Sequence, residues 1–220
     1  MKKTIALLFI AVFAVGYTYA QQNKQVAGSK NLEVLFAPLG GSPISLGGIK
    51  FRSFSSETSA FRVSVFVGFD SSTDVSLGGG SDGLGELNST SSTFDFSVRP
   101  GLEKHFTGTD KLSPYIGGEV LVGFSSSTEK DEMPATEAFE NKTKNGSLTF
   151  GLNALAGVDY YFAQNIYLGA EFGFGFSFES MMDQKETSTA EGAEDIITPK
   201  GSGINLGPTA VGQIRLGWLF

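Results

Sequence analysis

The stretch Gly212-Gln213-Ile214-Arg215-Leu216-Gly217-Trp218-Leu219-Phe220 decides the fold. Successive side chains of a strand point to opposite sides. An extended conformation therefore places Ile214, Leu216, Trp218 and Phe220 on one face, and Gln213 and Arg215 on the other. Strands with one apolar, aromatic face and one polar face are typical of membrane β-barrels, in which the apolar face contacts lipid. The alternation predicts a strand that closes such a barrel.

The first twenty residues have the three regions of a secretory signal peptide. Lys2 and Lys3 give a charged start, an apolar run follows over residues 5–15, and Thr18-Tyr19-Ala20 gives a cleavage site. The apolar run is shorter than the ~20 residues that a membrane-spanning helix needs. We expect residues 1–20 to be a cleaved signal peptide, residues 21–30 a flexible periplasmic leader, and residues 31–220 the barrel.

The charge of the chain limits its partners. Removal of Lys2 and Lys3 from the 16 basic residues leaves 14 against 23 acidic residues, a net charge of −9. Such a chain is repelled by nucleic acid, so no nucleic-acid partner is expected. The chain contains no cysteine, which excludes disulfides and thiolate metal sites.

The alternation of apolar and polar residues recurs in eight segments: 32–38, 46–55, 60–69, 92–106, 113–124, 147–162, 166–178 and 205–220. Short links over residues 56–59, 107–112 and 163–165 alternate with longer links over 39–45, 70–91, 125–146 and 179–204. Outer-membrane barrels have short periplasmic turns and long outer loops. The pattern predicts an all-β protein, an eight-stranded antiparallel transmembrane up-and-down β-barrel of a bacterial outer membrane. Its loops would be extracellular, and an even strand count puts both mature termini in the periplasm.

The outward aromatic residues are expected to form two girdles at the bilayer interfaces. A soluble barrel would instead turn its apolar residues inward to a cavity, but here the opposite face carries charges, which argues against that alternative. The loop-end girdle would be Phe69, Phe94, Phe124, Phe150, Phe176 and Phe178, and the turn-end girdle Phe61, Phe106, Tyr160, Phe162, Trp218 and Phe220.

The inward face collects charges of both signs: Glu33, Lys50, Arg52, Arg62, Asp95, Arg99, Glu103, Glu119, Asp159, Glu171 and Arg215. The interior of an eight-stranded barrel is just wide enough for side chains to fill it. Buried charges persist when they are paired and hydrogen-bonded. We therefore expect a lumen plugged by ion pairs. Counting residues from the turns predicts that Glu171 meets Arg215 and that Arg99 meets Glu119. A narrow path for ions or small solutes, lined by the same charges, is the alternative.

Catalytic and metal-binding patterns are sparse. The single histidine, His105, falls near the periplasmic end of the fourth predicted strand, with no candidate serine nucleophile in an obvious shared site. The three longer outer loops hold fifteen acidic residues and five lysines. These acids are expected to keep the outer surface solvated. Calcium binding by these acids is the more specific alternative, but the loops show no recognised calcium-binding spacing. No catalytic residue, cofactor or metal site is predicted.

The chain resembles the OmpA/OmpX-like family of eight-stranded outer-membrane proteins over nearly all of residues 31–220. The most specific element is the C-terminal stretch that contains Ile214, Leu216, Trp218 and Phe220. It looks like the signal by which the barrel-assembly machinery recognises its substrates. The resemblance implies contact with outer-membrane lipids and lipopolysaccharide. The chain ends at the predicted barrel, so no anchoring to the cell wall is expected.

Three functions remain open. The first is a structural or surface-interaction protein that presents acidic loops to an extracellular ligand or surface protein. The second is a narrow pore and the third is an outer-membrane enzyme. The polar filling of the lumen argues against conduction, and the position of His105 argues against catalysis. The first function is therefore preferred.

Overall fold

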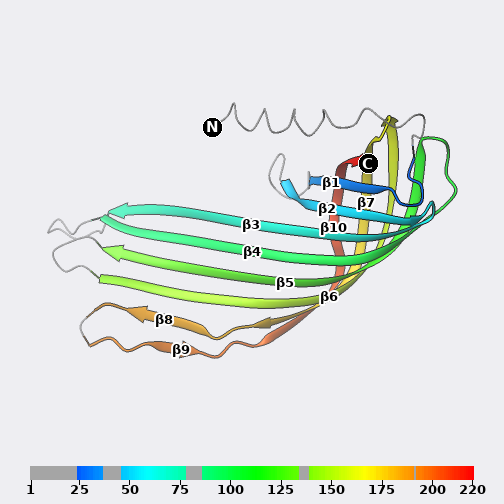
Figure 1. Cartoon of the computed structure of the whole chain (residues 1–220). Coiled ribbons are helices and arrows are strands. Elements are labelled where there is room, and N and C mark those ends of the chain that lie inside the picture. The colour runs from blue at the N-terminus through cyan, green and yellow to red at the C-terminus, as the bar shows by residue number, and fades with distance from the viewer. Residues whose placement is uncertain (1–23, 37–45, 78–85, 134–138, 191) are drawn as a thin grey trace.

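The computed structural model describes residues 24–36, 46–77, 86–133, 139–190 and 192–220. The expected signal peptide and the first outer loop lie outside these residues. Among the described residues, no helix is long and apolar enough to cross a membrane. One antiparallel sheet contains ten strands: β1 (Lys30–Phe36), β2 (Leu46–Ser56), β3 (Ser59–Leu77), β4 (Glu86–His105), β5 (Leu112–Met133), β6 (Phe139–Ala163), β7 (Ile166–Met181), β8 (Gln184–Ser188), β9 (Ile196–Thr198) and β10 (Ser202–Leu219) (Figure 1).

Eight of these strands form the barrel. Each of β1 to β6 pairs with the next strand along the chain, β7 pairs with β10, and β10 closes the ring by pairing with β1. At the closure, Leu32 lies opposite Trp218 and Val34 lies opposite Leu216. The predicted eight-stranded up-and-down barrel is confirmed, and its last strand makes the closing contact that the C-terminal alternation predicted.

The turns at one end of the barrel are short, as predicted. Strand β2 ends at Ser56 and β3 begins at Ser59, while β6 ends at Ala163 and β7 begins at Ile166. In the second turn Asn165 has a φ of 63°, a left-handed conformation that asparagine tolerates better than most residues. These tight turns fix the register of the strands that they join.

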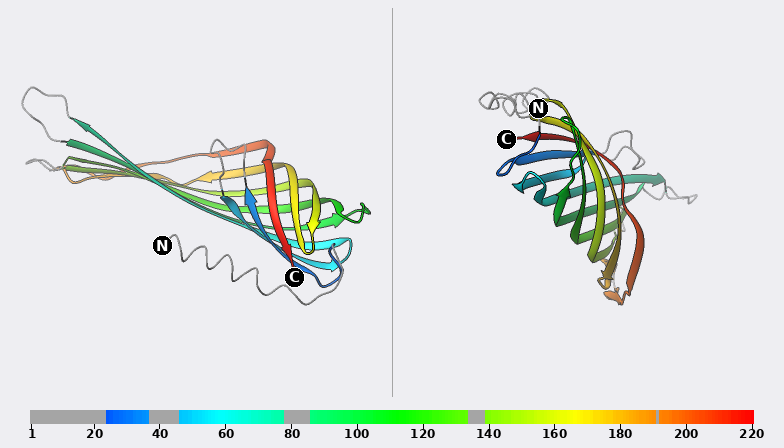
Figure 2. Two further views of the ribbon diagram at one scale, coloured as in Figure 1. Left: turned by 90° about the horizontal axis from the view of Figure 1, so that it is seen from above. Right: turned by 90° about the vertical axis from the view of Figure 1, so that its right-hand side faces the viewer.

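The other end of the barrel differs from the sequence prediction. Most of residues 70–91 and 125–146, which we expected to be loops, are strand, and β3 to β6 run on well beyond the ends of β1 and β2 (Figure 1). Seen from above, the long strands leave the barrel together on one side (Figure 2). Paired hydroxyl groups join the extended strands: Ser71 Oγ lies 2.9 Å from Ser92 Oγ, and Thr73 Oγ1 lies 3.0 Å from Thr90 Oγ1.

Polar residues explain why this extension was missed. Cross-strand hydroxyl pairs and opposite charges stabilise a sheet without any apolar face. Lys130 Nζ of β5 lies 3.2 Å from Glu140 Oε2 of β6, and Ser89 of β4 donates a hydrogen bond to Asp131 of β5. Apolar alternation does not reveal strands of this kind.

The last expected loop also contains regular structure. Within residues 179–204, β8 pairs with β6 from Asn141 to Lys144, and β9 pairs with β8. Figure 1 shows this hairpin beside the extended part of β6. An exposed ion pair joins it, with Lys185 Nζ at 2.9 Å from Asp195 Oδ2. Among the described residues, the end opposite the short turns is therefore formed by extended β-strands.

The two faces of the barrel are as different as the sequence predicted. Large apolar side chains cover the outside, and eleven of the twelve predicted girdle aromatics are exposed, while Trp218 is intermediate. The Trp218 and Phe220 rings lie 5.4 Å apart between centroids on this outer face. The charged side chains lie inside. Apolar exterior and charged interior are the arrangement that a bilayer requires of a spanning barrel.

Candidate functional site: a buried charge cluster and a pocket at the outer end

The interior of the barrel at the turn end is filled by a cluster of charged side chains. Nine of the eleven predicted inward charges are buried: Glu33, Lys50, Arg52, Arg62, Glu103, Glu119, Asp159, Glu171 and Arg215. Arg99 is partly exposed, and Asp95 is exposed. Burial of so many charges is tolerated only if each one finds partners.

Arg52 joins three strands of the barrel wall. From β2, its Nε lies 2.6 Å from Glu33 Oε1 of β1, its Nη1 lies 2.9 Å from Glu103 Oε2 of β4, and its Nη2 lies 2.7 Å from Asp159 Oδ2 of β6. The Tyr167 hydroxyl accepts a further hydrogen bond from Nη2 at 2.7 Å. A planar guanidinium offers five donors in a fixed geometry, so one arginine can hold several carboxylates at once.

Arg62 has the same role from β3, where it lies directly opposite Arg52. Its Nη1 lies 2.7 Å from Glu171 Oε2 and 3.0 Å from Glu103 Oε1, and its Nη2 lies 3.1 Å from Glu119 Oε2. Lys50 Nζ also donates to Glu171, at 3.0 Å. Glu171 therefore has two cationic partners on the opposite wall of the barrel, and these contacts cross the lumen.

The two pairs predicted by counting have longer separations than the contacts above. Arg215 Nη1 lies 3.8 Å from Glu171 Oε2, and Arg99 Nη1 lies 3.8 Å from Glu119 Oε1. The closer partners of Arg215 are Asp159 Oδ1 at 2.7 Å and Glu33 Oε2 at 3.0 Å. Strand stagger is the reason, because Glu171 lies opposite Gln213 and Arg215 lies opposite Gly169.

The cluster is balanced in charge. Five carboxylates share it with one lysine and four arginines, if the partly exposed Arg99 is included. Close packing accompanies this balance. A side-chain carbon added at Gly217 would lie 2.0 Å from Cζ of the Tyr167 ring. The ring therefore occupies the space that any other residue at position 217 would need.

Tyrosines and the leader complete the filling, and the sequence analysis missed both. Tyr115, Tyr161 and Tyr167 are buried, and Tyr115 donates a hydrogen bond to Glu171. Their inward strand parity could have identified them. Gln25 of the leader is also buried, and its amide donates to Ser113 Oγ at 2.8 Å and accepts from the Tyr161 hydroxyl at 2.9 Å. The described part of the leader is thus held in the turn-end mouth, in contrast to the flexible segment expected.

His105 has a serine neighbour, contrary to the sequence analysis. Its Nδ1 lies 2.9 Å from Ser113 Oγ, and its Nε2 lies 3.1 Å from Glu103 Oε2. The two residues flank the β4–β5 turn, which brings them together. Ser113 is fully buried, and the Gln25 amide is bonded to its hydroxyl. A nucleophile must be reachable by its substrate. Glu103, His105 and Ser113 instead form a buried chain of hydrogen bonds in this conformation, with Ser113 out of reach of a substrate.

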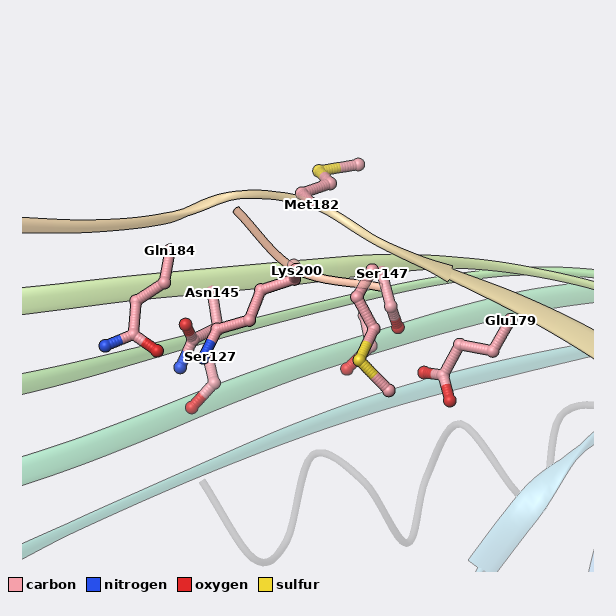
Figure 3. A pocket seen from close by; sticks show the side chains of 10 residues that line it. Ser127, Asn145, Ser147, Glu179, Met182, Gln184 and Lys200 are labelled. Carbon is pink, nitrogen blue, oxygen red and sulfur yellow. The ribbon is translucent and has the colours of Figure 1, made fainter. Parts of the chain in front are cut away.

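A pocket of about 320 Å³ lies at the outer end of the barrel (Figure 3). Strands β5, β6 and β7, the start of β8, and residues that link β7 to β8 and precede β10 form its wall. Serine and asparagine side chains, two methionines, one carboxylate and one ammonium group line it: Ser125, Ser127, Asn145, Ser147, Glu179, Met181, Met182, Gln184 and Lys200, beside Gly146. The sequence analysis placed Glu179 and Lys200 in an outer loop but did not bring them together.

The acidic residues of the outer end do not form a metal centre in the part of the chain that the structure covers. No group of three or more carboxylate or imidazole side chains there is arranged to hold a metal ion. Several of the acids are instead paired with lysines, as Glu140 is with Lys130 and Asp195 with Lys185.

A closed up-and-down barrel with an apolar outside and a charged inside belongs to the class of outer-membrane β-barrel proteins. Residues 86–193 match the model of the family described as "Putative OmpA-OmpF-like porin family". Over these residues the chain is similar to OmpA-like outer-membrane β-barrel proteins, and the resemblance predicted from the sequence is confirmed. No curated protein matches the chain significantly.

Several solved structures are similar to this chain at low sequence identity. A major outer membrane protein from Thermus thermophilus has a TM-score of 0.41 at 14% identity, with 87% of this chain and 99% of that chain covered. The N-terminal β-barrel domain of Pseudomonas aeruginosa OprF has a TM-score of 0.32 at 14% identity, covering 89% and 100%. Ail, the attachment invasion locus protein of Yersinia pestis, has a TM-score of 0.38 at 13% identity, covering 89% and 100%. Nothing about the function of this chain follows from these likenesses.

Proposed function

We propose that this protein is a closed-lumen barrel of the bacterial outer membrane that presents β-structure on the cell surface. The presented segments are the extensions of β3 to β6 and the β8–β9 hairpin. They would serve as surface structure or as the contact site for an extracellular ligand or surface protein. Outer-membrane lipids and lipopolysaccharide would surround the barrel, and the barrel-assembly machinery would bind Ile214, Leu216, Trp218 and Phe220 during biogenesis.

The observation that carries this proposal is the filled lumen. Arg52 and Arg215 have no exposed surface, and their partners come from strands on several sides of the barrel. Ions cannot pass through a bore that paired side chains occupy, unless the cluster opens. We therefore place the function of the protein in the segments outside the bilayer. A narrow pore would need the contacts of Arg52 and Arg62 to break, and an enzyme based on His105 would need Gln25 to leave Ser113.

We also propose an orientation, in which both termini are periplasmic and the long strands are extracellular. The absence of native cysteine makes it testable by labelling. We expect Ala190→Cys, exposed between β8 and β9, to react with a membrane-impermeant maleimide on intact cells. Asp110→Cys, exposed in the β4–β5 turn, is its matched control and should react only after the outer membrane is permeabilised. Labelling of the Asp110 variant alone on intact cells would show that the barrel is inserted the other way round.

A further inference from the structure

The pocket at the outer end contains two opposite charges that do not neutralise each other. Glu179 and Lys200 both line it, and neither forms an ion pair or a side-chain hydrogen bond with any residue that the structure describes. In Figure 3 the ammonium end of Lys200 lies toward Ser127 and Asn145, the Glu179 carboxylate lies at the other end of the pocket, and Ser147 lies between them. Two other lysines of this end, Lys130 and Lys185, are by contrast paired with carboxylates.

The wall between the two charges offers both polar and apolar contacts. Asn145 Oδ1 is shielded from solvent and accepts no hydrogen bond from described residues, so its hydrogen-bonding capacity is unused. Met181 lines the pocket and supplies flexible apolar surface that adapts to a methylene chain. Main-chain hydrogen bonds hold this side of the pocket in place. Met182 N–H donates to Gly146 O at 2.8 Å, and Met181 N–H donates to Gly201 O at 3.0 Å.

We propose that this pocket binds a small zwitterion whose ammonium and carboxylate groups are several bonds apart, the class of ω-amino acids and short peptides. Glu179 would receive the ammonium group and Lys200 the carboxylate. Methylene groups between them would contact Met181, and the serine hydroxyls and Asn145 would bond to polar groups of the ligand. A pocket of this volume lies at the lower end of the range for small-molecule sites.

Two features argue for a zwitterion over a simple anion or cation. A cation alone would leave Lys200 unpaired, and an anion alone would leave Glu179 unpaired, whereas one molecule with both charges satisfies both side chains. Hydrogen bonds between charged groups are stronger than neutral ones. In Figure 3 the two charges lie at different ends of the pocket, so we expect a ligand with well-separated charges to bind more tightly than one whose charges are adjacent.

Calorimetric titration of the folded barrel in an uncharged maltoside detergent tests the proposal. The probe is 6-aminohexanoate, and its matched analogues are 6-acetamidohexanoate, which lacks the ammonium group, and 6-aminohexanamide, which lacks the carboxylate. We expect the probe to bind about tenfold or more tightly than either analogue, as loss of one charged hydrogen bond predicts. Glycine, whose charges are adjacent, should also bind more weakly than the probe.

Two variants test which side chain binds each end of the ligand. Glu179→Gln should weaken binding of 6-aminohexanoate about tenfold or more, and leave 6-acetamidohexanoate almost unaffected. Lys200→Gln should do the same for the probe and leave 6-aminohexanamide unaffected. Lys185→Gln, which removes a paired lysine outside the pocket, is the control and should bind like the wild type. A wild-type barrel that is folded by circular dichroism and shows no binding of the probe overturns the proposal, as do variants that bind it unchanged.

The proposed ligand class rests on the proposed function of the outer end, because it names what the presented structure would bind. Its test is independent of the labelling experiment. Binding in detergent does not depend on which side of the membrane the pocket faces, and labelling does not depend on whether the pocket is occupied. Failure of one result therefore leaves the other standing.

Discussion

Replacement of Arg215 by alanine is expected to lower the free energy of unfolding of the barrel by about 3–5 kcal/mol. The guanidinium of Arg215 is fully buried and lies within 3.0 Å of both Glu33 and Asp159. Its removal leaves the cluster with one excess negative charge in a place that water does not reach. Unfolding in denaturant, followed by the fluorescence of Trp218, the only tryptophan, gives the measurement. Lys185→Ala, at an exposed ion pair, should change the same quantity by less than about 1 kcal/mol.

A double-mutant cycle identifies which carboxylate depends on Arg215. Asp159→Asn should recover more of the loss than Glu171→Gln, because Asp159 lies at 2.7 Å from Arg215 and Glu171 at 3.8 Å. Glu171 also keeps Lys50 and Arg62 as partners when Arg215 is absent. Strictly additive losses for the Arg215 and Asp159 substitutions would show that the two side chains do not interact.

Replacement of both Trp218 and Phe220 by aspartate is expected to abolish assembly of the barrel. These residues lie on the outer face of the segment that closes the ring, where Lys30 and Phe220 exchange two main-chain hydrogen bonds of 2.8–2.9 Å. The substitutions place charge on the lipid face at the closure, and they remove the aromatic side chains of the proposed assembly signal. The measurement is the amount of outer-membrane protein whose gel migration changes on boiling.

A substitution at the far end of the same strand is the control for this variant. Ile204 is exposed on β10 and lies opposite Phe178 of the loop-end girdle. Ile204→Asp should assemble, since a charge near a bilayer interface costs only about 0–1 kcal/mol. Normal levels of the Trp218 and Phe220 variant would show that these two side chains are not needed as a signal.

Apolar alternation predicted the barrel because the bilayer imposes it on the outer face of every strand. It located the eight barrel strands, their short turns and the charged interior. It did not predict the extensions of β3 to β6, which are stabilised by hydroxyl pairs such as Thr73 with Thr90 and by ion pairs such as Lys130 with Glu140. Such polar contacts do not require apolar residues at alternate positions, so a search for apolar alternation cannot find these strands.

The details of the interior were predictable only to a limited extent. The members of the charge cluster followed from strand parity, but the distances between them depended on strand stagger, which shifts Arg215 by two residues relative to Glu171. The bonds of Gln25 to Ser113 and Tyr161 come from a segment outside the barrel strands. No strand pattern could reveal them. The outer pocket likewise depends on the path of the chain between β7 and β10.

Conductance across a planar lipid bilayer is the decisive measurement for the closed lumen. The wild-type barrel, inserted from detergent alongside a general porin as a positive control, should show no steady channel, because paired side chains such as Arg52 with Asp159 and Arg62 with Glu171 fill the bore. Reproducible open steps from the inserted wild-type protein, in the absence of the control porin, would contradict the closed lumen and favour the narrow pore.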